Sequence, residues 1–175
     1  IGQAEHDIFA QWILISKDIK LIEKVKLEIT KQLRDIPRLS IAQKSLISNG
    51  ILMYVKSDKK IIDIVNKIAP EHLELNIKNY KSYVSKIRNS GSICLGKYAV
   101  MAMTDYNIGS NHVLPTNSSA KYSSGISVNE FYKRISYINL SKKGIETLGP
   151  SVITLANYEG LVGHAESVKL RIRRK

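Results

Sequence analysis

The sequence predicts an α/β protein with a mainly parallel sheet and flanking helices, followed by a small, mostly helical C-terminal segment. Two observations carry this prediction. Short apolar runs alternate with amphipathic helices whose start and stop signals can be read, which is the pattern of βαβ units. After Gly125 the apolar runs stop and helical patterns follow. The 175 residues are 43% hydrophobic, which is enough for a folded core.

The first third of the chain holds two predicted strands with helices between them. Residues 11–16 form a short apolar run, which indicates a buried strand. Asp18 is expected to cap a helix whose apolar residues recur every three or four positions, and Pro37 stops it. A short helix is expected over 40–48 and a second buried strand over 51–55.

A second set of elements follows with the same alternation. Asp58 is expected to cap a helix with an inward apolar face, and Pro70 ends that helix. Residues 73–77 indicate a strand and residues 80–87 a helical face. A short strand is predicted over 92–95, after a glycine turn. The order of these elements favours parallel pairing.

Between residues 98 and 124 the regular patterns fail. The stretch contains Gly109, Pro115 and several asparagines and serines, and we predict an irregular segment. It is too long to be an ordinary connection, and long irregular segments in compact domains are usually functional.

The last part of the chain is predicted to be helical. Residues 128–134 and 141–148 indicate short helices, and Ser151 begins a longer helix that reaches the basic C-terminus. We therefore expect two parts, an α/β domain over 1–125 and a helical tail over 126–175.

The charge balance and the lack of long apolar runs limit the partners of the chain. The formal net charge is +12 and the pI is about 9.7. The lysines are spread through nearly every segment, as the solvated faces of amphipathic elements are, and only residues 171–175 form a dense basic cluster. No apolar run approaches the roughly 18 residues that cross a bilayer. We expect neither nucleic-acid binding nor membrane insertion.

The single cysteine and the N-terminus indicate the setting of the chain. Cys94 lies between Ile93 and Leu95 and is predicted to be a buried structural thiol. One cysteine excludes an intrachain disulfide, which fits the reducing cytoplasm. The chain begins without Met and without a signal peptide. We expect a piece of a longer cytoplasmic protein.

No nucleotide-binding motif is predicted. The run over 91–98 nearly matches a phosphate-binding loop, but it has Tyr98 where Ser or Thr must hold magnesium, and its apolar interior favours a strand. No glycine-rich dinucleotide fingerprint occurs anywhere. We assign no cofactor-binding residue for a dinucleotide within this chain.

All four histidines stand in polar clusters. His6, His72, His112 and His164 each lie within seven residues of a carboxylate. Neutral imidazole is the commonest metal ligand in proteins and the usual proton carrier near pH 7. The clusters indicate either one converging site or four unrelated surface and capping histidines.

The side chains of Gln3, His6 and Asp105 together have the chemistry of a metal site. Gln3 and His6 are three residues apart and share one face of a helix or turn, while Asp105 comes from the irregular segment. An amide oxygen, an imidazole nitrogen and a carboxylate make a mixed nitrogen and oxygen site for zinc or a similar divalent ion. No cysteines are present for a purely structural zinc.

The other two clusters have alternative interpretations. Glu71 and His72 follow a proline at an element boundary, where both side chains can enter one pocket as an acid–base pair, or they form an ordinary surface pair at a helix end. Glu159 and His164 are five apart with two glycines between them. A bend there aligns both side chains, or they reach different parts of one site, or a site on a neighbouring subunit.

Five motifs in this order closely resemble the histidinol dehydrogenase family. They are the segments 3–6 (QAEH), 70–73 (PEHL), 91–96 (GSICLG), 105–116 (DYNIGSNHVLPT) and 159–164 (EGLVGH). The resemblance runs from Gln3 to the basic tail. It implies a Rossmann-like first domain, a C-terminal dimerisation segment and a homodimer. It also implies oxidation of L-histidinol to L-histidine in two NAD-dependent hydride transfers.

The resemblance also implies the ligands of one Zn²⁺ per subunit. Gln3, His6 and Asp105 match the family's zinc ligands, and His164 matches a ligand donated by the other subunit. The zinc is expected to position the substrate's imidazole and amine. The residues expected to contact substrate are Gln3, His6, His72, Asp105, Glu159 and His164.

The same resemblance implies roles in the reaction. His72 matches the acid–base residue, and Glu71 matches the residue that activates water for the second oxidation. Glu159 matches a residue that binds substrate across the dimer interface, and His112 is expected to play a supporting part only.

The chain departs from the family in size. The family's enzyme is more than twice as long, and its N-terminal part carries the NAD-contacting region. The resemblance therefore implies a C-terminal part of the enzyme that is inactive alone, either as a fragment of the full-length enzyme or as a naturally truncated protein. Two alternatives are a zinc-binding, dimerising remnant without redox activity and a basic nucleic-acid-binding module.

Overall fold

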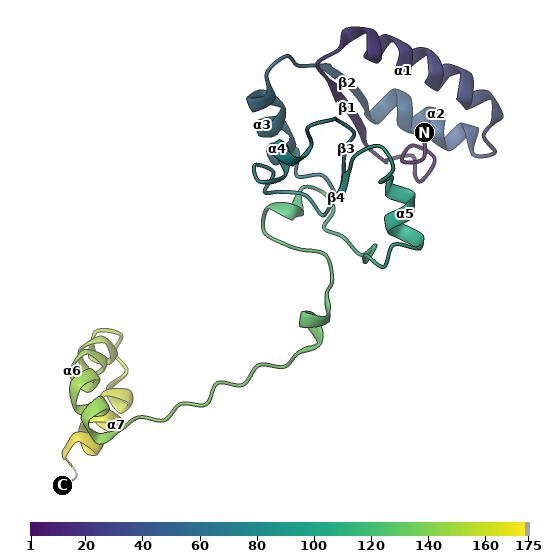
Figure 1. The fold of residues 1–175 in the computed structure, drawn as a ribbon. Coiled ribbons are helices and arrows are strands. Elements are labelled where there is room, and N and C mark those ends of the chain that lie inside the picture. Colours follow the sequence, from purple (N-terminus) through teal and green to yellow (C-terminus); the bar gives the residue numbers. More distant parts are fainter. Residues whose placement is uncertain (174–175) are drawn as a thin grey trace. The chain divides into compact units, whose positions relative to one another are not determined.

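The structure is a computed structural model that describes residues 1–173, so the last two residues of the predicted basic tail, Arg174 and Lys175, lie outside the described residues. By its internal contacts the chain divides into two units, Ile1–Phe131 and Tyr132–Lys175. Figure 1 colours the first purple to green and the second green to yellow. Each unit is described by itself.

The first unit begins with a parallel pair of strands. Strand β1 (Trp12–Ser16) pairs with β2 (Gly50–Tyr54) in parallel, with the first residues of the two strands opposite each other. A parallel pair needs a long crossover. Here the crossover consists of helix α1 (Ile19–Gln32), the 3-10 helix η1 (Leu33–Asp35) and helix α2 (Leu39–Asn49), and α1 contacts both strands.

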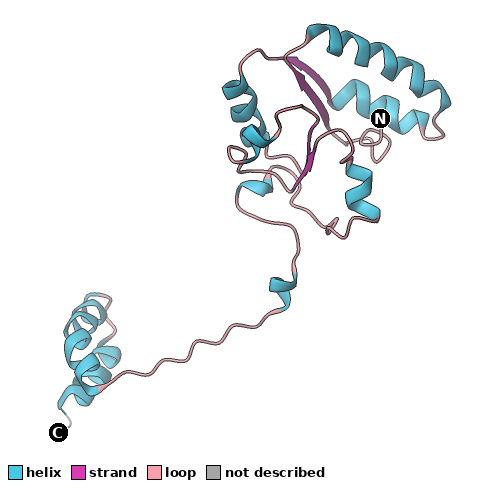
Figure 2. Ribbon diagram, in the orientation of Figure 1, coloured by secondary structure: helices cyan, strands magenta, loops and turns pink. Residues whose placement is uncertain are grey.

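A second parallel pair follows. It is formed by β3 (His72–Leu75) and β4 (Ser92–Leu95), with helix α3 (Asp58–Ile68) before it and the short helix α4 (Lys81–Val84) in its crossover. Figure 2 colours the strands magenta and the helices cyan. The parallel direction is confirmed. Among residues 1–173, however, the four strands are hydrogen-bonded as two separate pairs and not as one sheet.

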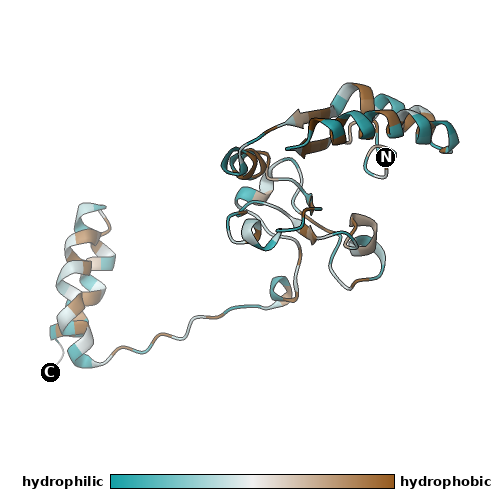
Figure 3. Cartoon of the chain, turned by 45° about the horizontal axis from the view of Figure 1, so that its top comes forward, coloured by the Kyte–Doolittle hydropathy of each residue, from teal (hydrophilic) through white to brown (hydrophobic). Residues whose placement is uncertain are grey.

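The core of the first unit lies between α3, α4 and the second strand pair. The predicted apolar faces of α1 and α3 point inward. Figure 3 shows mostly brown, apolar residues along β1 and β2. Side chains from three elements make the core continuous. The central buried residues are Ile62, Val65, Leu75, Tyr83 and Ile87.

The cap of α1 is confirmed and that of α3 is corrected. The Asp18 carboxylate accepts from the Lys20 backbone N–H at 2.8 Å. Helix α3 is capped by Ser57, whose hydroxyl accepts from the Lys60 N–H, and not by Asp58. Ser57 has the extended backbone that a cap requires, while Asp58 is already helical.

The Asp58 carboxylate instead ties three elements together. It accepts from Lys17 Nζ at 2.7 Å and from the Tyr83 hydroxyl at 2.5 Å. The hydrogen bond from Lys17 lowers the pKa of Asp58. Burial, followed by the bond to Asp58, raises the pKa of Tyr83 to about 12.

This raised pKa predicts a pH dependence of stability. A neutral Tyr83 phenol stabilises the fold fully below its ordinary pKa of 10.0, and the contribution is lost as the pH rises towards 12. We expect the melting temperature of the wild type to exceed that of Tyr83→Phe, and the difference to shrink over this range. Circular dichroism melts check it, with the exposed Tyr122→Phe as control. A constant difference would contradict the assignment.

The segment over 98–124 is less irregular than predicted. It contains helix α5 (Met101–Tyr106) and the 3-10 helix η2 (Ser119–Lys121). The Glu74 carboxylate accepts from the Met101 N–H at 2.9 Å, which supplies the beginning of α5 with a partner from β3. This contact is tertiary, so the local pattern did not reveal it.

The second unit is a pair of helices, preceded in the chain by the 3-10 helix η3 (Val128–Phe131) of the first unit. Helix α6 (Lys142–Tyr158) packs on α7 (Val162–Arg173). The prediction of two helices meeting near Ser151 was wrong, because α6 runs through Pro150. Pro150 is exposed, so the carbonyl that loses its partner there can bond to water.

No helix among residues 1–173 is long and apolar enough to span a membrane.

Candidate functional site

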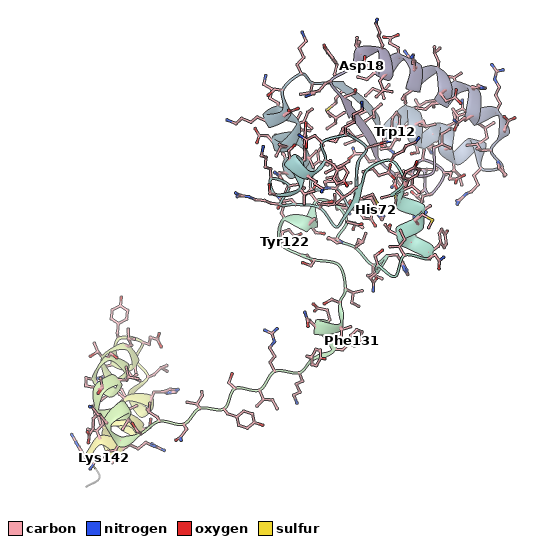
Figure 4. The ribbon with its side chains drawn as sticks, viewed as in Figure 1. Trp12, Asp18, His72, Tyr122, Phe131 and Lys142 are labelled. Atoms are coloured by element: carbon pink, nitrogen blue, oxygen red, sulfur yellow. The ribbon has the colours of Figure 1, made fainter. Side chains whose placement is uncertain are left out.

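A cavity of about 490 Å³ opens in the first unit. It brings together five of the predicted site residues, from the N-terminal loop, the start of β3 and α5. Its lining residues are Gly2, Gln3, Glu5, His6, Pro37, Arg38, Glu71, His72, Met101, Ala102, Asp105 and Tyr106. His72 is labelled beside α5 in Figure 4. Two of the four histidines, His6 and His72, therefore share one site.

The N-terminal loop over 1–11, which carries Gln3 and His6, is anchored to α2. The Ser45 hydroxyl, fully buried, donates to the Ala10 carbonyl at 2.7 Å. The Asn49 side-chain amide donates to the Ile8 carbonyl at 3.0 Å. Neither anchor is predicted by the sequence. Their only local signal is a serine on the apolar face of a helix.

We expect Ser45→Ala to destabilise the protein by about 1–3 kcal/mol, because it removes the buried hydroxyl and leaves the half-buried Ala10 carbonyl without its partner. We also expect faster hydrogen exchange of amides in the loop over 1–11. Mass-spectrometric hydrogen exchange measures both effects. Ser40→Ala, an exposed serine of the same helix, is the matched control. Unchanged exchange in the loop would remove Ser45 as an anchor.

The backbone at Glu71 and His72 is held by the neighbouring strand. The Gly91 N–H donates to the Pro70 carbonyl at 2.9 Å, and the Ser92 N–H donates to the Glu71 carbonyl at 2.8 Å. These bonds extend the β3–β4 ladder backwards by two residues. Glu71 and His72 therefore lie at the hydrogen-bonded beginning of β3, and the predicted element boundary at this position is confirmed.

The two side chains face one another without a hydrogen bond. His72 Nε2 lies 3.8 Å from Glu71 Oε1, which is beyond hydrogen-bonding distance. The His72 side chain is 15% exposed and that of Glu71 is 34% exposed. His72 Nδ1 is buried and has no partner among residues 1–173. Unpaired buried nitrogens of this kind occur at catalytic and ion-binding positions.

Asp105 reaches the cavity from α5, which Glu74 holds at its N-terminus. Two further lining residues, Arg38 and Tyr106, were not predicted. Tyr106 directly follows Asp105 and is 88% exposed. His112 is exposed and does not line the cavity.

Glu159 and His164 lie in the second unit, at the turn between α6 and α7. Gly160 has φ +75°, which ends α6 there, so the predicted glycine break is present. Gly163, by contrast, is inside α7. Both side chains are exposed. Glu159 follows the last residue of α6, and His164 is in the first turn of α7.

The donor set of the first unit fits a zinc ion in its chemistry. Gln3, His6 and Asp105 offer an amide oxygen, an imidazole nitrogen and a carboxylate to one cavity. Within residues 1–173 no three His, Cys, Asp and Glu side chains form a metal site by themselves. A zinc centre here therefore needs the Gln3 amide and a further donor.

Cys94 takes no part in this site. It is 3% exposed, as expected for a structural thiol. Burial raises its pKa, with a smaller contribution from the Glu74 carboxylate. A thiol held in its protonated form is a poor nucleophile.

The N-terminal loop, the start of β3 and helix α5 bring a glutamate–histidine pair and further nitrogen and oxygen donors to a single cavity, an arrangement typical of enzymes. Comparison with known families identifies it further. The model of the family "Histidinol dehydrogenase" matches residues 1–172. The chain belongs to the histidinol dehydrogenase family.

The relatives agree with this assignment. The chain is 79% identical over 175 residues to the histidinol dehydrogenase of Pelagibacter ubique, covering 100% of the chain and 41% of the relative. It is 42% identical over 171 residues to that of Listeria monocytogenes serovar 1/2a, covering 98% and 40%. The crystal structure of histidinol dehydrogenase from Elizabethkingia anophelis matches with a TM-score of 0.87 and 37% identity, over 98% of this chain and 40% of that one. The chain thus spans about 40% of the length of these relatives.

Proposed function

We propose that the chain supplies the zinc-binding and acid–base part of a histidinol dehydrogenase, an oxidoreductase that converts L-histidinol to L-histidine with two NAD, as the last step of histidine biosynthesis. The observation that carries this is the convergence of Gln3, His6, Glu71, His72 and Asp105 on one cavity in a member of this family. We place the protein in the cytoplasm.

In the first oxidation His72 acts as the base. It takes the hydroxyl proton of the alcohol while the carbon-bound hydrogen leaves as hydride to NAD, so that an aldehyde and NADH form. The cavity wall keeps this imidazole mostly out of water, with 15% of its side chain exposed. The buried Nδ1 of His72 has no hydrogen-bond partner in the part of the chain that the structure describes, which supports the proposal that a bound ligand supplies one.

In the second oxidation Glu71 activates water. Its carboxylate takes a proton from the water whose oxygen adds to the aldehyde carbon, and the resulting hydrate loses a hydride to a second NAD as the acid forms. Glu71 is the more exposed of the pair, which suits a residue that must meet water.

The zinc ligands are proposed to be Gln3, His6 and Asp105, with His164 from a second copy. When bound, the ion supplies a positive centre that holds the substrate's imidazole and amine in place. The same three residues, with His72, Glu159 and His164, form the proposed substrate contacts. Glu159 neutralises a cationic group of the substrate.

We infer that residues 1–125 are an incomplete Rossmann-like domain. The two parallel strand pairs become parts of one sheet when the rest of the enzyme is present, and that remainder binds most of the NAD. The absence of any dinucleotide fingerprint from this chain supports the division. We expect the 175-residue chain alone to form no NADH from histidinol, as absorbance at the NADH band measures. Robust turnover would show that NAD is held by this chain.

We propose that residues 126–175 form a dimerisation segment that donates Glu159 and His164 to the partner. An exposed apolar stripe on α6 supports this: Leu148, Val152 and Leu155 are 56%, 44% and 62% exposed and are spaced as one helix face. The adjoining face of α6, with the buried Gly149 and Ala156, packs on α7, where Gly149 lies against Ile172. An uncovered apolar stripe ending near Glu159 fits a surface that a second copy covers.

Complementation between inactive subunits tests this proposal. We define the extended enzyme as this chain joined to the part of the Pelagibacter ubique relative that it does not cover. His72→Asn and His164→Ala subunits are each expected to be inactive alone. If His164 acts in the partner's site, their heterodimer has one intact site.

A one-to-one mixture refolded together is then expected to recover about a quarter of the wild-type activity, because about half of the dimers are mixed and each has one working site. No recovery, although mixed dimers form, would place His164 in its own subunit's site. If neither the mixture nor the wild-type extended enzyme shows zinc-dependent turnover, the proposed function itself is overturned.

A further inference from the structure

The cavity has one lining residue whose charge the reaction described above does not use. Arg38 follows Pro37 at the start of α2 and is the only permanent cation among the lining residues. The other permanent charges there are the carboxylates of Glu5, Glu71 and Asp105. Within residues 1–173 the Arg38 guanidinium makes no ion pair, even with these carboxylates, and its side chain is exposed.

Three carboxylates around one cavity repel any anion that enters or forms there. A guanidinium is always protonated, and its planar fork matches the two oxygens of a carboxylate or phosphate. Among the lining side chains, the free guanidinium is therefore the one permanently charged group that attracts an oxyanion.

We propose that Arg38 binds an oxyanion of the ligand in this cavity, and that it sets the preference of the site for anionic over uncharged ligands at that position. The proposal rests on the proposed function, which brings two such groups to the site. One is the carboxylate that the second oxidation creates on the product. The other is the phosphate of the dinucleotide. L-Histidinol has neither group, so it is the internal control.

The test measures the affinities of three ligands for the zinc-loaded extended enzyme by isothermal titration calorimetry: L-histidine, L-histidinol and NAD. Arg38→Gln is expected to weaken the binding of histidine or of NAD by roughly tenfold to a hundredfold, the worth of a charge-assisted hydrogen bond. Histidinol binding should stay unchanged. Arg38→Lys should lose part of the affinity, because it keeps the charge without the fork. Arg34→Gln, an exposed arginine of η1 outside the cavity, is the matched control.

The pattern of losses identifies the oxyanion. Loss for histidine alone assigns Arg38 to the carboxylate, and loss for NAD alone assigns it to the phosphate. Unchanged affinity for both, equal loss for histidinol, or the same loss from Arg34→Gln would overturn the proposal. If the wild-type extended enzyme binds none of the three ligands, the proposed function is overturned. If the wild type binds them and the Arg38 variant binds them equally well, only the proposal for Arg38 is overturned.

Discussion

Replacing His72 with Asn in the extended enzyme is expected to lower kcat by a factor on the order of 10² to 10⁴, the usual worth of a positioned acid–base group. Asparagine keeps the size and polarity of the side chain but cannot accept the proton of the alcohol. His72 is not a proposed zinc ligand, so zinc content should stay at the wild-type level. Stopped-flow absorbance at the NADH band and calorimetric binding of histidinol measure the two quantities.

Comparing kcat with zinc content and histidinol affinity distinguishes a catalytic role of His72 from a purely structural one. A merely structural His72 would affect zinc content, histidinol affinity and melting temperature together, because its ring is largely buried beside α5. Loss of kcat with all three preserved is the expected pattern. Loss of zinc in His72→Asn would mean that the imidazole is a ligand and that another residue is the base.

Glu71→Gln tests the division of labour within the pair. The first oxidation needs no water, so NADH formation from the alcohol should be spared, while oxidation of the aldehyde should fall by the same order of magnitude as above. The two substrates are supplied separately, and the first turnover is followed in each case. Glu23→Gln, on the exposed side of α1, is the matched control. Equal damage to both steps would remove the assigned role of Glu71.

The second large effect is expected from Gly91→Ala. A Cβ at this position would lie 2.6 Å from the Glu71 carbonyl oxygen and 3.0 Å from Pro115 Cδ. Both neighbours are held, the carbonyl by its bond from Ser92 and the proline by burial. Relief requires the β3–β4 entry to open, so we expect a loss of about 1–3 kcal/mol in stability.

The displaced backbone carries the proposed acid–base pair, so activity should fall with the melting temperature. Differential scanning calorimetry and turnover of the extended enzyme test this together. Gly163→Ala, with nothing within 4 Å of the added Cβ, is the glycine control and should melt at or above the wild-type temperature. If Gly91→Ala has the wild-type melting temperature and activity, the beginning of β3 and β4 accommodates the added Cβ without cost, which would contradict this expectation.

Local patterns predicted most elements of the first unit, because each depends on neighbours in sequence. The strand at Ser92–Leu95 was predicted at its true ends, and the apolar face of α1 points inward as expected. Errors arose where two residues compete or a tertiary contact decides. Ser57 caps α3 in place of the predicted Asp58. The Glu74 carboxylate accepts from the first N–H of α5, a helix in a segment that was predicted to be irregular.

The candidate site shows the same limit. Motif chemistry selected Gln3, His6, Glu71, His72 and Asp105, and all five line one cavity. Their convergence depends on contacts between distant segments, which no local pattern encodes. Ser45, a helical serine whose buried hydroxyl holds the N-terminal loop, could not be recognised from its neighbours. Arg38 has no motif of its own and became visible only as the unpaired cation of the cavity.

The most direct test of the account is the position of zinc in crystals of the extended enzyme, found by anomalous scattering at the zinc absorption edge. We expect one peak per subunit in the cavity of the first unit, in contact with Gln3, His6 and Asp105, and with the partner's His164 completing the coordination. A peak elsewhere, with these three side chains pointing apart, would contradict it.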